Sequence, residues 1–211
     1  MAKADSMPIM NSAMSGSSRD PGADLRTRFE EVALPLLGPL YGAAVRMTDR
    51  ERAADLVQET CLRAYRTFAN FTPGTNAKAW LFTIMYSVFV NTYRRARREP
   101  TVVSLDELEA RFDRTLDVPD ATGLVEILRN PELDWKGSEA DQALQRLPEE
   151  FRLAVLLVDV EELSYEEAAA VAHCPMGTLR SRLFRGRKML WLELQDYARK
   201  RGYVKGGREG K

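Results

Sequence analysis

Apolar side chains recur at intervals of three and four residues in several separate stretches of the chain, a spacing that predicts α-helices. The first stretch, 24–47, has an apolar face but contains Pro35 and Pro39, so we expect its helix to be kinked or split. A second helix is predicted to be capped by Thr48 or Asp49 and to run to about Phe68.

A loop and a third helix follow. Residues 70–76, NFTPGTN, contain Pro-Gly and two asparagines, which predict a loop. The next helix is expected from Ala77 to about Arg98, and four of its last five residues, 94–98, are arginines. Cations at a helix C-terminus suit the helix dipole, but four arginines exceed that need. Because single-stranded DNA binding combines aromatic rings with guanidinium groups, this helix is a candidate nucleic-acid site.

Four helices are predicted in the C-terminal part of the chain. The first two span 141–147 and 149–160 and are separated by Pro148. The third opens at Ser164, which stands three residues before Glu167, the spacing of a capping box.

The fourth helix begins after Pro175 and carries Leu179, Leu183 and Phe184 at core spacing. Every charged residue in 176–191 is basic, so no acidic residue is available there for i,i+4 pairing. A short helix, a tight turn and an arginine-rich second helix describe a helix-turn-helix, whose second helix enters the DNA major groove. An ordinary helical hairpin with a solvated basic face is the alternative.

Charge is balanced over the chain but segregated along it. The 211 residues include 31 basic and 31 acidic side chains. Acidic residues outnumber basic ones between residues 100 and 150, whereas 94–98 and 176–188 are basic. The acidic part also contains several prolines and glycines, so it is predicted to be an interdomain linker. Such a linker is either a passive tether or a strand that threads a channel built for nucleic acid.

The two cysteines, Cys61 and Cys174, lie in predicted structured segments, and the chain contains no CxxC motif. Neither a zinc site nor a disulfide framework is therefore expected, which suits a protein of the cytoplasm. The longest apolar run, 79–90, is shorter than the roughly 20 residues that a membrane span needs.

These patterns predict an all-α protein made of two small helical domains. The domains are expected at 23–98 and 139–202, and the acidic linker at 99–138 joins them. Residues 1–22 are interpreted as a disordered leader and residues 203–211 as a flexible tail.

The chain resembles a bacterial RNA polymerase sigma factor of the extracytoplasmic-function type, within the sigma-70 family. The resemblance lies in three stretches that follow the family's order and spacing: DLVQETCLRAYRTF (55–68), AWLFTIMYSVFVNTYRRARR (79–98) and LPEEFRLAVLLVDVEELSYEEAAAVAHCPMGTLRSRLFRGRKML (147–190). It implies that the two domains are sigma regions 2 and 4. The implied function is an alternative sigma factor that binds core RNA polymerase and directs it to specific promoters.

The resemblance also implies roles for three sets of residues. The first set would dock on the clamp helices of the polymerase β′ subunit and consists of Asp55, Gln58 and Glu59. The second would read the melted non-template strand of the −10 element, with a base flipped into a pocket formed by the loop, and consists of Asn70, Phe71, Asn76, Lys78, Asn91, Arg94 and Arg95. The third would read the −35 duplex and consists of Thr178, Arg180, Ser181, Arg182, Arg185 and Arg187.

Further partners follow from the same resemblance. Region 4 would contact the β flap, and the linker would run through the active-centre and RNA-exit channels as an acidic mimic of RNA. Two shorter stretches, GTNAKAW (74–80) and RRARREP (94–100), are similar to the subgroup that answers thiol-oxidative stress and is held by a zinc-binding anti-sigma factor.

Two features depart from the family pattern. His173-Cys174 occupies turn positions where the family more often has Gly-Val, which predicts a strained turn. The linker is long for the family, which suggests an extra helix around residues 124–129.

Two other classes of function compete with this interpretation. A stand-alone helix-turn-helix regulator that binds DNA as a dimer would need a dimerisation element or a sensor domain, and it would leave the polar and basic cluster 91–98 unexplained. An enzyme is disfavoured because the single histidine, His173, has no cluster of several cysteines or carboxylates beside it, and because no phosphate-binding glycine loop is present. No catalytic residue, cofactor or metal is therefore predicted.

Overall fold

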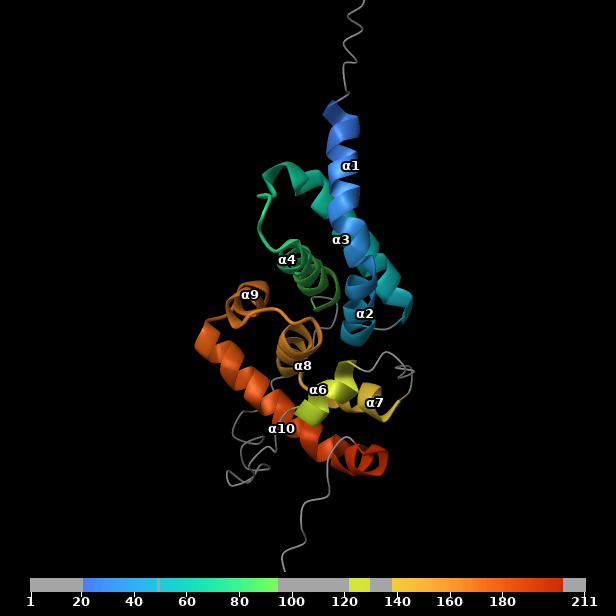
Figure 1. Ribbon diagram of the computed structural model, residues 1–211, viewed down its shortest axis with the longest axis vertical. Coiled ribbons are helices and arrows are strands. Elements are labelled where there is room, and N and C mark those ends of the chain that lie inside the picture. Colours follow the sequence, from blue (N-terminus) through green and yellow to red (C-terminus); the bar gives the residue numbers. More distant parts are fainter. Residues whose placement is uncertain (1–20, 49, 95–121, 130–137, 203–211) are drawn as a thin grey trace, which may run out of the picture.

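The computed structural model describes residues 21–48, 50–94, 122–129 and 138–202, and these residues form helices and connecting turns. Two groups of helices lie one above the other in Figure 1. The upper group contains α1 (Pro21–Ala33), α2 (Leu37–Met47), α3 (Arg50–Thr67) and α4 (Ala77–Phe89). The lower group contains α6 (Thr122–Arg129), α7 (Glu139–Arg146), α8 (Glu149–Val155), α9 (Tyr165–Val171) and α10 (Met176–Arg201). The predicted all-α fold class is confirmed.

The proline-rich first stretch is split, as its sequence predicts. A short 3-10 segment, Leu34–Leu36, separates α1 from α2 and contains Pro35. Helix α1 begins at Pro21, two residues before the predicted start of the domain. Helix α2 packs on α3 through small and aliphatic side chains, because Ala43, Ala44, Ala53 and Leu56 are almost fully buried. Small side chains at a helix contact let the two backbones approach closely.

Helix α4 is capped and almost surrounded by other helices. The side chain of Asn76 accepts hydrogen bonds from the N–H groups of Lys78 and Ala79 at 3.0 and 3.2 Å, which fixes the first turn. Leu81, Phe82 and Met85 are at most 1 % exposed. The helix continues as a π-helical segment, Val90–Arg94, which ends at the last described residue of this part of the chain.

The helix-turn-helix forms as predicted, with α9 and α10 as its two helices. Ser164 and Glu167 make the expected capping box. His173 in the turn has φ +48°, in the left-handed region that a residue with a Cβ rarely adopts, so the turn is strained. Gly186 lets α10 approach α8, because a Cβ at this position would lie 2.8 Å from Cγ2 of Val155.

The extra helix suggested by the long linker is present as α6. Leu124, Ile127 and Leu128 are at most 1 % exposed, and they pack α6 against α10 and the π-helical segment after α8, Leu156–Val160. Arg129 extends from the last turn of α6 and pairs with Glu162. The rest of the predicted linker, 99–121 and 130–137, lies outside the described residues.

Two negative observations apply to the described parts of the chain. No group of three or more His, Cys, Asp and Glu side chains there is placed to hold a metal ion. No helix among these residues has the length and apolarity needed to cross a membrane.

Candidate nucleic-acid interface

The three residues predicted to dock on polymerase share one face of α3. Asp55 and Gln58 are exposed, and Glu59 is half-buried. Positions three and four apart lie on the same side of a helix, so the three side chains form a single polar stripe. Nε of Arg63 donates to Oε1 of Glu59 at 2.6 Å, whereas Asp55 and Gln58 face solvent.

The loop after α3 is supported by aromatic packing. The ring of Phe71 stacks on Phe68, with centroids 5.6 Å apart, and also contacts Trp80 at 4.9 Å. Phe71 is therefore half-buried and anchors the loop, while Asn70 is exposed. Gly74 has φ +87°, a conformation that glycine adopts without strain, and it turns the chain towards α4.

Two residues of the predicted −10 set, Asn76 and Lys78, point towards the lower group of helices. Nδ2 of Asn76 donates to Oε1 of Glu167 at 2.7 Å. Nζ of Lys78 lies 2.8 Å from Oε2 of Glu161. The hydrogen bond from the Ser164 N–H, together with that from Asn76, holds the pKa of the Glu167 carboxyl below its ordinary value. The sequence pattern pointed to Glu167 only as the capping partner of Ser164, and it gave no indication that Glu161 or Glu167 would contact the loop and α4.

The remaining residues of the −10 set lie at the other end of α4. Asn91 is exposed on the π-helical segment that follows α4. Arg94 is the last residue of that segment, and its side chain is not described. Arg95 lies outside the described residues. The structure therefore places Asn76 and Lys78 at one end of α4 and Asn91 at the other.

The N-terminal half of α10 presents a mixed polar and aromatic surface. Arg180 and Ser181 are exposed, whereas Thr178 and Arg185 are half-buried. The guanidinium of Arg180 lies 5.4 Å from the centre of the Tyr165 ring, which holds it at the start of α9.

The prediction that Phe184 belongs to the core is wrong, because its side chain is 57 % exposed. The position lies one residue beyond Leu183, which is buried, and four beyond Arg180. It therefore shares the outer face of α10 with Arg180, not the face that packs inward.

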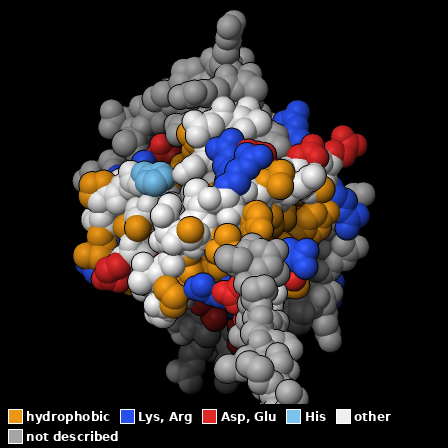
Figure 2. Space-filling model, turned by 90° about the horizontal axis from the view of Figure 1, so that it is seen from above, with side chains coloured by type: hydrophobic (Ala, Val, Ile, Leu, Met, Phe, Trp, Pro, Cys, Tyr) orange, Lys and Arg blue, Asp and Glu red, His pale blue; other side chains and the backbone are white. Residues whose placement is uncertain are grey.

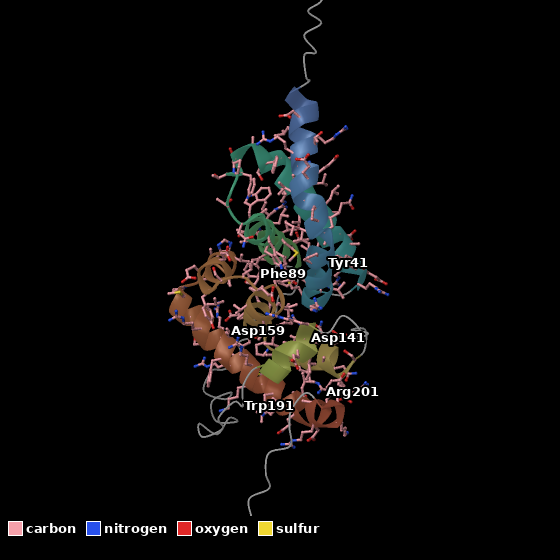
Figure 3. The ribbon with its side chains drawn as sticks, in the orientation of Figure 1. Tyr41, Phe89, Asp141, Asp159, Trp191 and Arg201 are labelled. Atoms are coloured by element: carbon pink, nitrogen blue, oxygen red, sulfur yellow. The ribbon has the colours of Figure 1, made fainter. Side chains whose placement is uncertain are left out.

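Two other arginines of the predicted −35 set are held by carboxylates of their own domain. Nη2 of Arg182 lies 2.8 Å from Oε2 of Glu150. Arg187 donates from two nitrogens to the carboxylate of Asp159, which is 2 % exposed. These hydrogen bonds raise the pKa of Arg187. Asp159 belongs to the π-helical segment after α8, and Figure 3 places it beside α8 and α10, so this pair ties that segment to α10.

The visible surface at the α1 end of the molecule carries no single dominant charge. Figure 2 shows basic and acidic side chains there among hydrophobic patches. Exposed large hydrophobic residues of the upper group include Leu34, Leu62 and Tyr65. Protein–DNA interfaces are much more positively charged than this mixed surface.

Comparison with known proteins decides the family. Residues 34–99 match the family profile "Sigma-70 region 2", and residues 138–190 match "Sigma-70, region 4". The chain is 39 % identical over 141 residues to the ECF RNA polymerase sigma factor EcfG of Rhodopseudomonas palustris, which covers 66 % of this chain and 70 % of that protein. The chain belongs to the extracytoplasmic-function sigma factors of the sigma-70 family.

Other sigma factors show the same relationship. The RNA polymerase sigma-H factor of Pseudomonas aeruginosa is 32 % identical, over 81 % of this chain and 88 % of that protein. SigE of Mycolicibacterium smegmatis is 37 % identical, and this chain spans 58 % of its length. The likeness extends across both groups of helices.

Solved structures give the same result. The sigma factor RpoE of Bartonella quintana, crystallised with the anti-sigma factor NepR, has a TM-score of 0.60 and 29 % identity, with 80 % of this chain and 98 % of that chain covered. CnrH, solved with the cytosolic domain of CnrY, has a TM-score of 0.55 and 22 % identity, which supports the fold alone. Both structures agree with a fold that contains sigma regions 2 and 4.

Proposed function

We propose that this sigma factor binds core RNA polymerase through the exposed face of α3 and reads promoters at two separate surfaces. The observation that carries the proposal is that one chain holds a polar stripe on α3 and an arginine-bearing helix-turn-helix, each in a segment that matches its own sigma region. A stand-alone DNA-binding regulator would explain the helix-turn-helix but not the polar stripe on α3. The sigma factor itself would be a specificity subunit of the cytoplasm and would not be a catalyst.

The −35 duplex would be read by the exposed side of α10. Arginine forms paired hydrogen bonds with guanine in the major groove, and an aromatic ring suits the methyl group of thymine. Arg180 and Arg185 are the proposed guanidinium contacts, and the exposed Phe184 joins them. Thr178 and Ser181 supply hydroxyl groups on the same helix. The carboxylate partners of Arg182 and Arg187 instead support a role for these two in holding α10 in place.

The −10 strand would be read along the loop and along α4. Asn70, Asn76 and Lys78 stand at the loop end of this path, and Asn91 stands at the far end. Phe71 would act through the loop, because its ring packs against Phe68 and Trp80. Arg94 and Arg95 are included in the proposed −10 site because they follow Asn91 closely in the sequence.

An anti-sigma factor is the proposed regulator. The proposal is supported by the likeness to RpoE of Bartonella quintana, which was crystallised with NepR. A zinc-binding anti-sigma factor and a thiol-oxidative signal remain hypotheses from the two short stretches of sequence. Burial raises the pKa of the Cys61 thiol, so this cysteine is a poor candidate for a reactive thiolate.

Asn91→Ala should impair promoter opening while leaving polymerase binding intact. Asn91 is exposed on the π-helical segment after α4 and is not part of the stripe on α3, so its loss removes an amide from the proposed strand path and leaves every side chain of the stripe in place. Permanganate reactivity of thymines in the promoter bubble, measured with holoenzyme, should fall several-fold. Gln195→Ala removes an amide from α10 and serves as the control. Unchanged reactivity in Asn91→Ala would exclude this residue from the −10 site.

A further inference from the structure

Helix α6 lies outside the segment that matches sigma region 4, yet it shares the core of that region. The matched segment is 138–190, and α6 ends at Arg129. The side chains of Leu124, Ile127 and Leu128 are at most 1 % exposed. Helix α6 packs on α10, as the lower part of Figure 1 shows. Because a helix of this length is unstable in water by itself, α6 depends on this packing for its structure.

The last residue of α6 binds the segment that holds α10. Nε of Arg129 donates to the backbone oxygen of Asp159, which lies in the π-helical segment after α8. The carboxylate of Asp159 in turn accepts hydrogen bonds from Nε and Nη2 of Arg187 on α10. Arg187 stands two residues after Arg185, a proposed −35 contact. A chain of hydrogen bonds therefore runs from α6 to the part of α10 that is proposed to read duplex DNA.

Glu162 holds the other side of the Arg129 guanidinium. Its carboxylate pairs with Nη1 of Arg129, and its φ of +58° lies in the left-handed region. This conformation is unfavourable for a residue with a Cβ. The paired side chains of Arg129 and Glu162 are 40 % and 66 % exposed, and an ion pair so exposed contributes little to stability. Stability alone therefore does not account for a glutamate at this position, whereas orientation of the guanidinium does.

We propose that α6 braces the −35 reader, and that Arg129 and Glu162 are positioning residues that fix the orientation of α10 without touching DNA. The inference rests on the proposed −35 role of α10. Groups that bind a ligand keep their geometry through the packing and hydrogen bonds of the residues behind them. Base edges are read by paired hydrogen bonds from accurately placed donors, whereas phosphate contacts carry no sequence information. Without the brace, α10 should therefore lose discrimination between base pairs more than it loses binding to DNA.

The test measures run-off transcription by holoenzyme from a cognate promoter and from a copy with substituted −35 base pairs. The ratio of the two yields, with sigma factor limiting, is the discrimination ratio. A smaller folded fraction lowers both yields equally and leaves this ratio unchanged. Hydrogen exchange of the amides of 176–190 in the free full-length chain reports on α10 independently of DNA.

Arg129→Ala is compared with Arg146→Ala, a matched control. Arg146 on α7 pairs with Glu193 on α10, so its loss removes the same charge and an arginine–carboxylate link to the second half of α10. A well-placed pair of hydrogen bonds to a base discriminates by about five-fold or more, so loosening α10 in Arg129→Ala should lower the discrimination ratio by at least about three-fold. The amides of 176–190 should also exchange faster. Arg146→Ala should leave the ratio and the exchange at their wild-type values.

Glu162→Gly separates positioning from support of the fold. Glycine adopts a positive φ without strain, so the midpoint of urea unfolding should stay the same or rise. The discrimination ratio should nevertheless fall, because the Arg129 guanidinium loses its carboxylate. A residue that only supported the fold would change stability and leave the ratio unaltered. This variant also serves as the test if circular dichroism shows that Arg129→Ala has lost helix.

A discrimination ratio that stays at the wild-type value in both Arg129→Ala and Glu162→Gly would overturn the brace. If the wild type itself transcribes the two promoters equally, the proposed −35 role of α10 fails, and hydrogen exchange decides about the brace. Faster exchange of 176–190 in Arg129→Ala than in Arg146→Ala would then support the link between α6 and α10. Equal exchange in these two variants would overturn it.

Discussion

Replacing both Arg180 and Arg185 by alanine should reduce transcription from a cognate promoter by about 30-fold or more when the sigma factor is limiting. Each guanidinium that contacts a base contributes about 1–3 kcal/mol, so the pair contributes at least about 2 kcal/mol. Arg180 is exposed on the outer face of α10 and needs no rearrangement of the core to reach DNA. Run-off transcription with purified core polymerase measures the effect.

Arg199→Ala/Lys200→Ala is the matched control for this double variant. It removes the same two positive charges from the same helix, at exposed positions far from the turn of the helix-turn-helix, where Arg199 pairs with Asp196. Transcription should change less than two-fold in the control. If the two double variants transcribed equally well, α10 would not be the −35 reader.

Asp159→Ala should lower the free energy of unfolding by about 2–4 kcal/mol. Breaking a buried ion pair from one side costs about 3–5 kcal/mol because the other charge stays buried, and the 26 % exposure of Arg187 reduces that cost. The lost carboxylate also removes the link between α10 and the π-helical segment after α8. Urea unfolding followed by circular dichroism gives the difference.

Asp196→Ala provides the comparison for an exposed ion pair. Asp196 is 78 % exposed and pairs with Arg199 at 3.3 Å, so its loss should cost less than about 0.5 kcal/mol. Asp159→Asn keeps the side-chain volume and one hydrogen-bond acceptor, so its free energy of unfolding should lie between those of Asp159→Ala and Asp196→Ala. Equal stability of Asp159→Ala and Asp196→Ala would show that the Arg187–Asp159 pair does not hold region 4 together.

Most helices were predictable because their signals are local. Pro35 splits the first helical stretch, Asn76 caps α4, and Ser164 with Glu167 caps α9. Each signal depends on the backbone groups of neighbouring residues. The strain at His173 was also predictable, because the residue type conflicts with the turn conformation.

The edge of a buried helix face and the contacts between distant residues were not predictable in the same way. Leu183 and Phe184 are adjacent in the sequence, yet one is buried and the other is 57 % exposed, because helix spacing alone does not fix the edge of the buried face. Arg187 carries the same charge as Arg180 but lies opposite Asp159, a partner 28 residues away. The contacts of Asn76 and Lys78 with Glu167 and Glu161 depend on how the two regions pack, which no periodicity encodes.

The central claim, that the stripe on α3 recruits RNA polymerase, is tested most directly by capture of purified bacterial core enzyme on the tagged full-length chain. Asp55 and Gln58 are exposed, so the double variant Asp55→Ala/Gln58→Ala should keep its fold and lose a docking contact. We expect stoichiometric capture by the wild type and at least about ten-fold weaker capture by the double variant. If the wild type and the double variant captured core enzyme equally well, the stripe on α3 would not be the docking surface.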